Sequence, residues 1–218
     1  MINLILKDIL LQKKTAVYLL LYIAIFILAF QSIAAGAFTA IVIALTYQMV
    51  STVCNYDDKA NSDIVMNSLP LTRKTIVLSK YLSVIVYALL AIVGYMAFTL
   101  IFTLMPVGLK IYPITLEGLS VALAGVMVMN GIYYPVYFKL GYNKARIVSF
   151  ILFFIFFFGG MTLIQTKINL ADITNQSAGG YLNQGMNIMQ FVLIIAAAAV
   201  LFAASCFISV RFYSNREF

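Results

Sequence analysis

Long apolar runs separated by short polar intervals dominate the chain, and the longest polar interval in its first two thirds extends from Asn55 to Tyr81. A membrane-spanning helix needs about 20 apolar residues, so each long run predicts a crossing of a bilayer. Thr15 to Val53 contains no charged residue, and as a helix it would be about 58 Å long, twice the hydrocarbon thickness. This run must therefore reverse, and we expect the turn at the small and polar residues from Gln31 to Gly36.

The same reasoning applied to the whole chain predicts one all-α integral membrane domain with six transmembrane helices and no soluble domain. The predicted segments are an interfacial helix at 1–14, spans one and two within 15–53 (15–31 and 35–53), a cytoplasmic loop at 54–74, spans three and four within 75–138, span five at 147–164, an exterior loop at 165–187 and span six at 188–210.

The first fourteen residues, Met1 to Lys14, place apolar residues on one helical face and polar residues elsewhere. This pattern is typical of a helix that lies in the membrane interface. The alternative is a simple extension of the first span. A cleaved signal peptide is a further alternative, because Lys13 and Lys14 precede an apolar run that ends in small residues.

Fourteen Lys and Arg residues outnumber seven acids, and they flank the apolar runs. They do not gather on a soluble segment with aromatic residues between them, so nucleic acid is not the expected partner. With both termini in the cytoplasm, only Lys110 and Lys167 lie outside, as the positive-inside rule requires. We therefore expect a multi-pass protein of the cell membrane. Cys54 and Cys206 then lie toward the reducing side, where a disulfide is not expected.

Catalytic residues are scarce in this chain, which is 64% hydrophobic and contains no His. It has no GxSxG, HExxH or GxxxxGK[ST] motif and no pair of acids within a span. We therefore expect no enzyme activity, no metal site and no cofactor on this chain. Only the stretch from Asn130 to Tyr137, with Pro135 predicted to kink the helix, brings polar residues to one depth. It could line a pathway or serve helix packing, and it is the one hint of a small membrane enzyme.

A short amphipathic helix is predicted within the polar interval. The N-cap residue types at 61–63 precede an apolar stripe at helical spacing, and Pro70 ends the helix. The stripe consists of Ile64, Val65, Met66 and Leu69. Thr72 can cap the next helix. Arg73 and Lys74 in the first turn of that helix oppose its dipole, and an anionic lipid surface is the simplest feature that would favour them.

The string SLPLTRKTIVLSKYL at 68–82, with Asp57, Asp58 and Asp63 before it, resembles the permeases of type-2 ABC exporters. The likeness is greatest to a small subfamily of low-GC Gram-positive bacteria that includes phenol-soluble-modulin and antimicrobial-peptide exporter permeases. The opening INLILKDILLQKK also resembles that subfamily. The six-span layout extends the resemblance over the whole chain.

This resemblance implies that the short helix is a coupling helix, which docks into a groove on a separate cytoplasmic ABC ATPase that binds ATP and Mg. Acids before the helix could meet basic residues of that partner. The alternative is that the apolar stripe lies on lipid and the acids are merely solvated. The implied ATPase-coupling residues are Asp57, Asp58, Asp63, Ile64, Met66, Asn67, Ser68, Leu69 and Arg73.

The resemblance further implies a second permease chain, identical or related, that faces the first across spans one, two and five. A pathway between two chains would suit amphipathic peptides, antibiotics or lipid-like molecules. A non-transporting membrane anchor or regulatory subunit is the alternative function. Candidate pathway residues are Gln31, Thr39, Thr46, Gln48, Asn130 and Tyr134.

Overall fold

The computed structural model describes most of the chain, and every regular element that it describes is helical. This confirms the predicted all-α class for the described residues. Those residues are 2–13, 21–22, 24–26, 36–60, 62–68, 72–104, 114–173 and 188–215.

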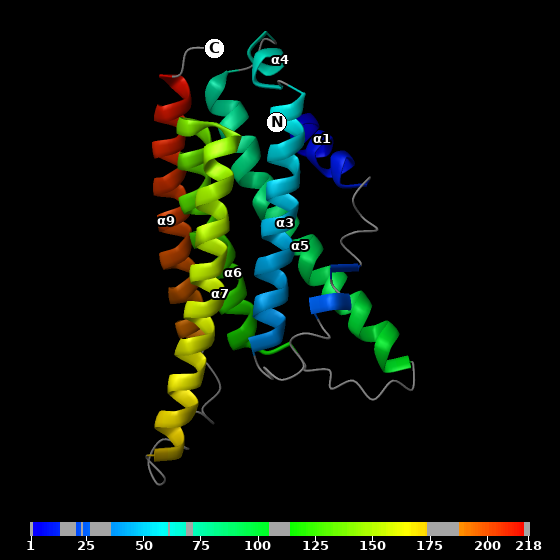
Figure 1. Cartoon of the computed structure of the whole chain (residues 1–218), viewed down its shortest axis with the longest axis vertical. Coiled ribbons are helices and arrows are strands. Elements are labelled where there is room, and N and C mark those ends of the chain that lie inside the picture. Colours follow the sequence, from blue (N-terminus) through cyan, green and yellow to red (C-terminus); the bar gives the residue numbers. More distant parts are fainter. Residues whose placement is uncertain are drawn as a thin grey trace.

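Long helices stand roughly side by side, with a short helix between two of them at one end (Figure 1). At this end α3, α6 and α9 finish and α5 and α7 begin, and we call it the α4 end. The helices are α1 (Ile2–Lys13), α3 (Ala37–Lys59), α4 (Ser62–Ser68), α5 (Arg73–Leu104), α6 (Leu116–Leu140), α7 (Tyr142–Ile173) and α9 (Ile188–Ser214).

Within the described residues, four helices are long and apolar enough to cross a membrane, namely α3, α5, α6 and α9. They correspond to the predicted spans two, three, four and six. Most of the predicted first span lies outside the described residues. The predicted fifth span lies within α7, which continues as helix through residues 165 to 173, where the sequence predicted a loop.

Two helix boundaries follow from local chemistry. The Thr115 side chain accepts a hydrogen bond from the Gly118 amide at 3.1 Å and so caps the start of α6. Gly141, with φ at 79° and ψ at 172°, separates α6 from α7. That backbone conformation is open essentially only to glycine, which explains the residue at this turn. Pro135 lies inside α6, which continues through it.

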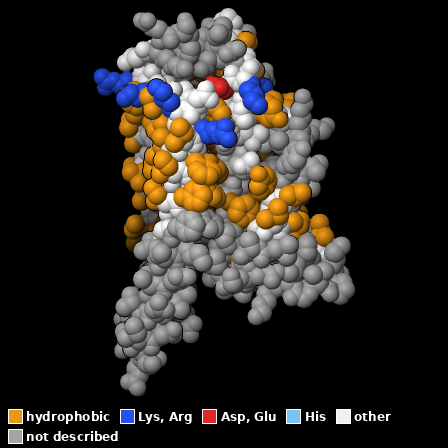
Figure 2. Space-filling view, in the orientation of Figure 1, with side chains coloured by type: hydrophobic (Ala, Val, Ile, Leu, Met, Phe, Trp, Pro, Cys, Tyr) orange, Lys and Arg blue, Asp and Glu red, His pale blue; other side chains and the backbone are white. Residues whose placement is uncertain are grey.

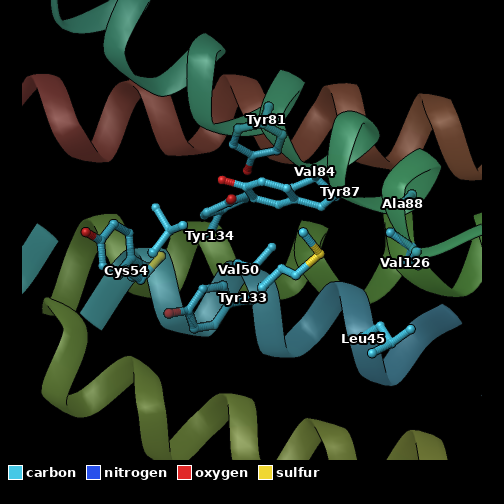
Figure 3. Packing of buried hydrophobic residues seen from close by; sticks show 14 of the residues in the cluster. Leu45, Val50, Cys54, Tyr81, Val84, Tyr87, Ala88, Val126, Tyr133 and Tyr134 are labelled. Carbon is cyan, nitrogen blue, oxygen red and sulfur yellow. The ribbon is translucent and has the colours of Figure 1, made fainter. Parts of the chain in front are cut away.

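The core is formed mainly by the facing sides of α3, α5 and α6 and is rich in tyrosine (Figure 3). Tyr81 and Tyr134 lie with ring centroids 4.9 Å apart. Val42 and Val77 of the same core are fully buried. Small residues such as Ala122 allow the helices to approach closely.

Hydroxyl groups attach α9 to the rest of the bundle. The Tyr81 hydroxyl forms hydrogen bonds with Ser205 at 2.8 Å and with Ser209 at 2.7 Å. Ser205 also donates to the backbone carbonyl of Gly131 in α6. Because these groups are removed from water, the bonds fix the rotation of α9 against α5 and α6.

Apolar side chains cover much of the outer surface, as a membrane protein requires, while Lys and Arg side chains gather toward the α4 end (Figure 2). On α9, for example, Leu193, Val200 and Phe207 are exposed. The exposed cations near the α4 end are Lys59, Lys74, Lys139, Lys144, Arg146 and Arg211.

Candidate functional site

The short helix α4 connects the end of α3 to the start of α5 and has distinct inner and outer sides. Met66 is 7% exposed and belongs to the hydrophobic core, whereas Val65 is 56% exposed. Ser68 is exposed as well, and its hydroxyl donates to the Val65 carbonyl at 2.8 Å. The prediction of a short helix here is confirmed. The placement of Met66 among the outward contacts is corrected, because Met66 fastens α4 to the bundle.

Asp57 also differs from its predicted place in a partner-facing loop. Helix α3 continues past residue 53 to Lys59, and these extra turns direct Asp57 into the bundle. Its side chain is 4% exposed and accepts hydrogen bonds from Lys7 at 2.9 Å and from Lys80 at 2.5 Å. Asp57 is therefore committed to internal ion pairs. Asp58, the next residue, is exposed.

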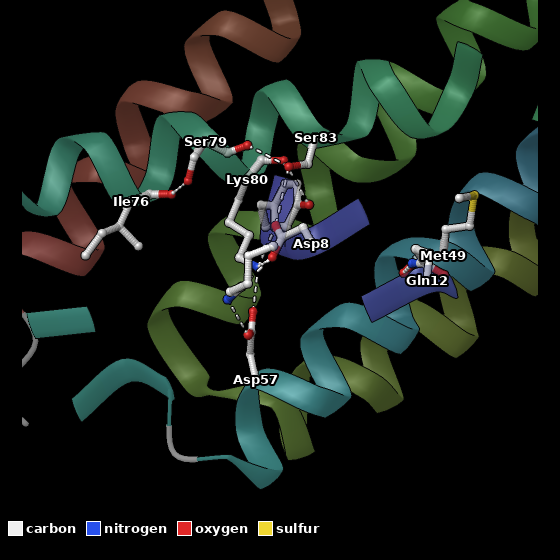
Figure 4. A network of polar contacts seen from close by, with 10 residues as sticks. Asp8, Gln12, Met49, Asp57, Ile76, Ser79, Lys80 and Ser83 are labelled. Atoms are coloured by element: carbon white, nitrogen blue, oxygen red, sulfur yellow. Dashed lines mark hydrogen bonds and ion pairs between the residues drawn. The ribbon is translucent and has the colours of Figure 1, made fainter. Parts of the chain in front are cut away.

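A charge cluster of Lys7, Asp8, Asp57 and Lys80 joins three helices. We call it the buried charge cluster, because Asp8, Asp57 and Lys80 are buried (Figure 4), while Lys7 lies at its edge with a side chain 37% exposed. The Lys80 ammonium donates to both carboxylate oxygens of Asp8, at 3.0 and 2.9 Å. Ser83 donates to Asp8 at 3.3 Å. Two acids and two lysines balance one another, so the cluster places no net charge inside the protein.

A second polar contact fixes the start of α5. The Arg73 guanidinium donates to the backbone carbonyls of Ser214 at 2.8 Å and of Tyr213 at 3.5 Å. These carbonyls belong to the last turn of α9, where the helix dipole favours a cation. An anionic lipid surface was the feature expected to favour cations at this helix start, and in the structure Arg73 contacts the end of α9. Thr72 caps α5 as predicted, since its hydroxyl accepts from the Thr75 amide at 3.3 Å.

Of the other predicted coupling residues, Ser68 and Asp58 are exposed at the α4 end. Tyr56 and Val65, which the prediction did not include, are exposed beside them. The side chains of Asp63, Ile64, Asn67 and Leu69 lie outside the described residues.

The predicted pathway residues do not share one surface. Thr46 is fully buried and donates to the Val42 carbonyl in its own helix, as Asn130 does to Val126. Tyr134 is buried and donates to the Lys80 carbonyl at 3.2 Å. These three residues make packing contacts within the chain, and their assignment to a pathway stays a prediction.

The remaining pathway residues lie elsewhere. Thr39 bonds to the Gly118 carbonyl at 3.2 Å and thereby joins α3 to α6. Gln31 lies outside the described residues. Gln48 lines a cavity of about 190 Å³ whose walls are mostly aromatic. The other lining residues are Tyr22, Phe26, Ala44, Leu45, Tyr47, Phe150 and Phe153.

The described residues at the α4 end offer apolar, hydroxyl and carboxylate groups that can bind and position another protein. The described residues contain no cluster of His, Cys, Asp or Glu that could hold a metal ion. Val65 and Ser68 are exposed on α4, and Tyr56 and Asp58 are exposed in the last turns of α3, next to the inward-facing Asp57.

Asp8 was not among the predicted site residues, because it is one of the polar residues of the predicted interfacial helix that lie off its apolar face. One signal could have identified the contact. Lys80 is the one charged residue between Thr75 and Leu104, and a cation that enters an apolar helix requires an acidic partner. The candidate acidic partners of Lys80 were few, and they included Asp8 in the first helix and Asp57 near the end of the helix that precedes α4.

Comparison with known proteins gives one clear relationship. Residues 3–214 match the family described as ABC-2 family transporter protein. Neither a curated protein nor a solved structure matches the chain.

Proposed function

Because this chain belongs to the ABC-2 transporter family, it is a membrane permease of an ABC transporter, and we propose that α4 is the contact through which a separate cytoplasmic ATPase drives it. The observation that carries this proposal is the two-sided character of α4. Met66 holds the helix to the core while Val65 faces outward at 56% exposure. An apolar anchor on a short exposed helix is suited to a groove on another protein.

Charge supports the cytoplasmic orientation of this contact. The exposed cations of the described residues gather at the α4 end, which is the arrangement that the positive-inside rule gives to a cytoplasmic face. We infer that six spans place both termini on this side of a cell membrane, in keeping with a Gram-positive origin.

The surface offered to the ATPase comprises Val65 and Ser68 on α4 together with Asp58 at the end of α3. To these we add Asp63, Ile64, Asn67 and Leu69, on the strength of the sequence alone. Asp58 and Asp63 would meet basic residues of the partner. Asp57, Met66 and Arg73 hold this surface in place from within the permease.

The transported molecule would be an amphipathic peptide, an antibiotic or a lipid-like compound that passes between two permease chains. The cavity beside Gln48 supports a pathway along spans one, two and five. It is lined by Tyr22 from the first, by Tyr47 from α3 and by Phe153 from α7. Aromatic walls with one amide suit a molecule that is largely apolar.

Co-purification tests the ATPase contact. The tagged permease is isolated from its native membranes in mild detergent, and the bound ATPase is measured by ATP hydrolysis and identified by mass spectrometry. Val65→Asp should reduce the bound ATPase about tenfold, because a buried charge in the groove would cost more than 1.4 kcal/mol. The matched control is Asn143→Asp, which adds the same charge at an exposed position of α7.

If Val65→Asp retains as much ATPase as Asn143→Asp, then α4 is not the contact. The second candidate function is a non-transporting anchor or regulatory subunit. It is distinguished by reconstituting the complex in vesicles and measuring ATP-dependent movement of a fluorescein-labelled amphipathic peptide. Movement supports the exporter, and its absence with active ATPase present favours the regulatory subunit.

A further inference from the structure

Helix α1 turns its polar side toward the protein and its apolar side outward. Asp8 is 1% exposed and Gln12 is 5% exposed, whereas Leu6 and Leu10 are 52% and 57% exposed. A helix that floats on a membrane surface would keep its charged residues in water. The orientation observed here indicates that α1 is attached to the bundle by its polar residues, with leucines left for lipid.

The contacts of α1 reach both helices that flank α4. Toward α5, Asp8 binds the Lys80 ammonium through both oxygens and accepts from Ser83. Toward α3, Lys7 donates to Asp57 at 2.9 Å, and the Gln12 amide donates to the Met49 carbonyl at 2.7 Å. Helices α3 and α5 are in turn bridged by Asp57 and Lys80 (Figure 4).

The energetic character of these contacts matters for their role. Buried ion pairs contribute little net stability relative to apolar residues of the same shape, because desolvation offsets the attraction. They do fix geometry, since an ammonium shared by two carboxylates cannot slide along a helix as apolar side chains can. The buried charge cluster therefore determines where α1 sits relative to the base of α4.

We propose that Asp8 is a positioning residue that locks α1 to α3 and α5, so that α1 and α4 move as one rigid unit. The consequence for transport rests on the proposed function, because it assumes that an ATPase moves α4. Movement of α4 would then carry α1, with its exposed leucines, along the bilayer surface. The lock itself can be tested on the permease alone.

The test measures distances between spin labels in lipid nanodiscs by pulsed electron resonance. One pair of labels is placed at Leu10→Cys on α1 and Ser68→Cys on α4. A reference pair is placed at Ser68→Cys and Asn143→Cys on α7. Cys54 and Cys206, both free thiols, are replaced by alanine in every sample.

The variant combines Lys7→Gln with Asp8→Asn, which removes the two α1 charges that belong to the buried charge cluster and leaves the Asp57 to Lys80 pair intact and balanced. The α1 to α4 distance distribution should widen about twofold or more, because local attachment is lost while the bundle remains folded. The reference distribution should stay unchanged. Asp58→Asn, which alters an exposed acid nearby, should change neither distribution.

An α1 to α4 distribution that stays as narrow in the variant as in the unaltered chain would overturn the proposal. Equal widening of both distributions would also overturn it, since that result indicates general loosening. Should this variant not fold, Asp8→Asn alone gives a second test with the same expected outcomes, because it keeps the Asp57 to Lys80 bridge and leaves the extra positive charge on Lys7, whose side chain is 37% exposed. No ATPase is present, so a failed co-purification and a failed distance measurement are separate results.

Discussion

The Lys80 ammonium of α5 lies 2.5 Å from a carboxylate oxygen of Asp57 in α3, although the whole of α4 separates the two residues along the chain. This contact joins the end of α3 to the beginning of α5, the two helices that α4 connects. Asp8 of α1 binds the same ammonium from the other side. The helices on either side of α4 are thus held together by directional bonds.

Lys80→Met should strongly destabilise the permease. It leaves Asp8 and Asp57 buried with Lys7 as their remaining cationic partner in the cluster. Breaking a buried pair in this way costs about 3–5 kcal/mol. The unfolding free energy is measured by titration with SDS in detergent micelles, and Lys74→Met, at an exposed position of the same helix, is the control. Equal stability of the two variants would show that the cluster is not buried as described.

Tyr81→Phe should destabilise the attachment of α9. The hydroxyl that it removes is bonded to Ser205 and Ser209, so about 0.5–2 kcal/mol of unfolding free energy should be lost. Tyr87→Phe is the matched control, since the buried Tyr87 hydroxyl has no hydrogen-bond partner among the described residues. It should be neutral or stabilising in the same titration. A larger loss for Tyr87→Phe than for Tyr81→Phe would contradict the assigned bonds.

Substitution of two glycines by alanine should have opposite effects. Gly141→Ala forces a side chain into a backbone conformation with φ at 79° and ψ at 172°, at a cost of about 1–3 kcal/mol. Gly159→Ala places a methyl group in open space within α7 and should add up to about 1 kcal/mol through helix propensity. Thermal midpoints in detergent give the comparison. A Gly141→Ala midpoint at or above that of Gly159→Ala would contradict the turn geometry.

Arg73→Ala should loosen the end of α9 without unfolding the bundle. Its guanidinium donates to the Ser214 and Tyr213 carbonyls, which have few alternative donors at a helix end. Hydrogen exchange measured by mass spectrometry should become faster for the peptide that contains the last turn of α9. Lys74→Ala, one residue further along and exposed, should leave that peptide unchanged. Unchanged hydrogen exchange in Arg73→Ala would show that this contact does not stabilise the last turn of α9.

The sequence predicted the elements of this fold where hydrophobic length is decisive. The spans at 35–53, 75–105, 116–138 and 188–210 each correspond to a helix that is long and apolar enough to cross a membrane. The short helix before Pro70 and the cap at Thr72 were also predicted correctly, because both depend on residues close in sequence. Helix ends were less accurate, as the continuation of α3 to Lys59 shows.

The direction of individual side chains could not be derived in the same way. Asp57 and Arg73 are charged residues in a polar interval, and Met66 is one of several apolar residues in a short helix, so nothing local indicates that these three face inward. Tyr134 and Asn130 likewise read equally well as pathway or packing residues. Their roles depend on helices far away in sequence, such as α1 for Asp57 and α9 for Arg73.

By itself the sequence determined that this is an α-helical membrane protein with a short amphipathic helix in its main polar interval, because bilayer thickness and local capping act on neighbouring residues. The tertiary structure decided which charged side chains are exposed to a partner and which form ion pairs inside the protein. Ion pairs form between groups that meet in space, and the meeting of Asp8, Asp57 and Lys80 exists only once α1, α3 and α5 have packed together.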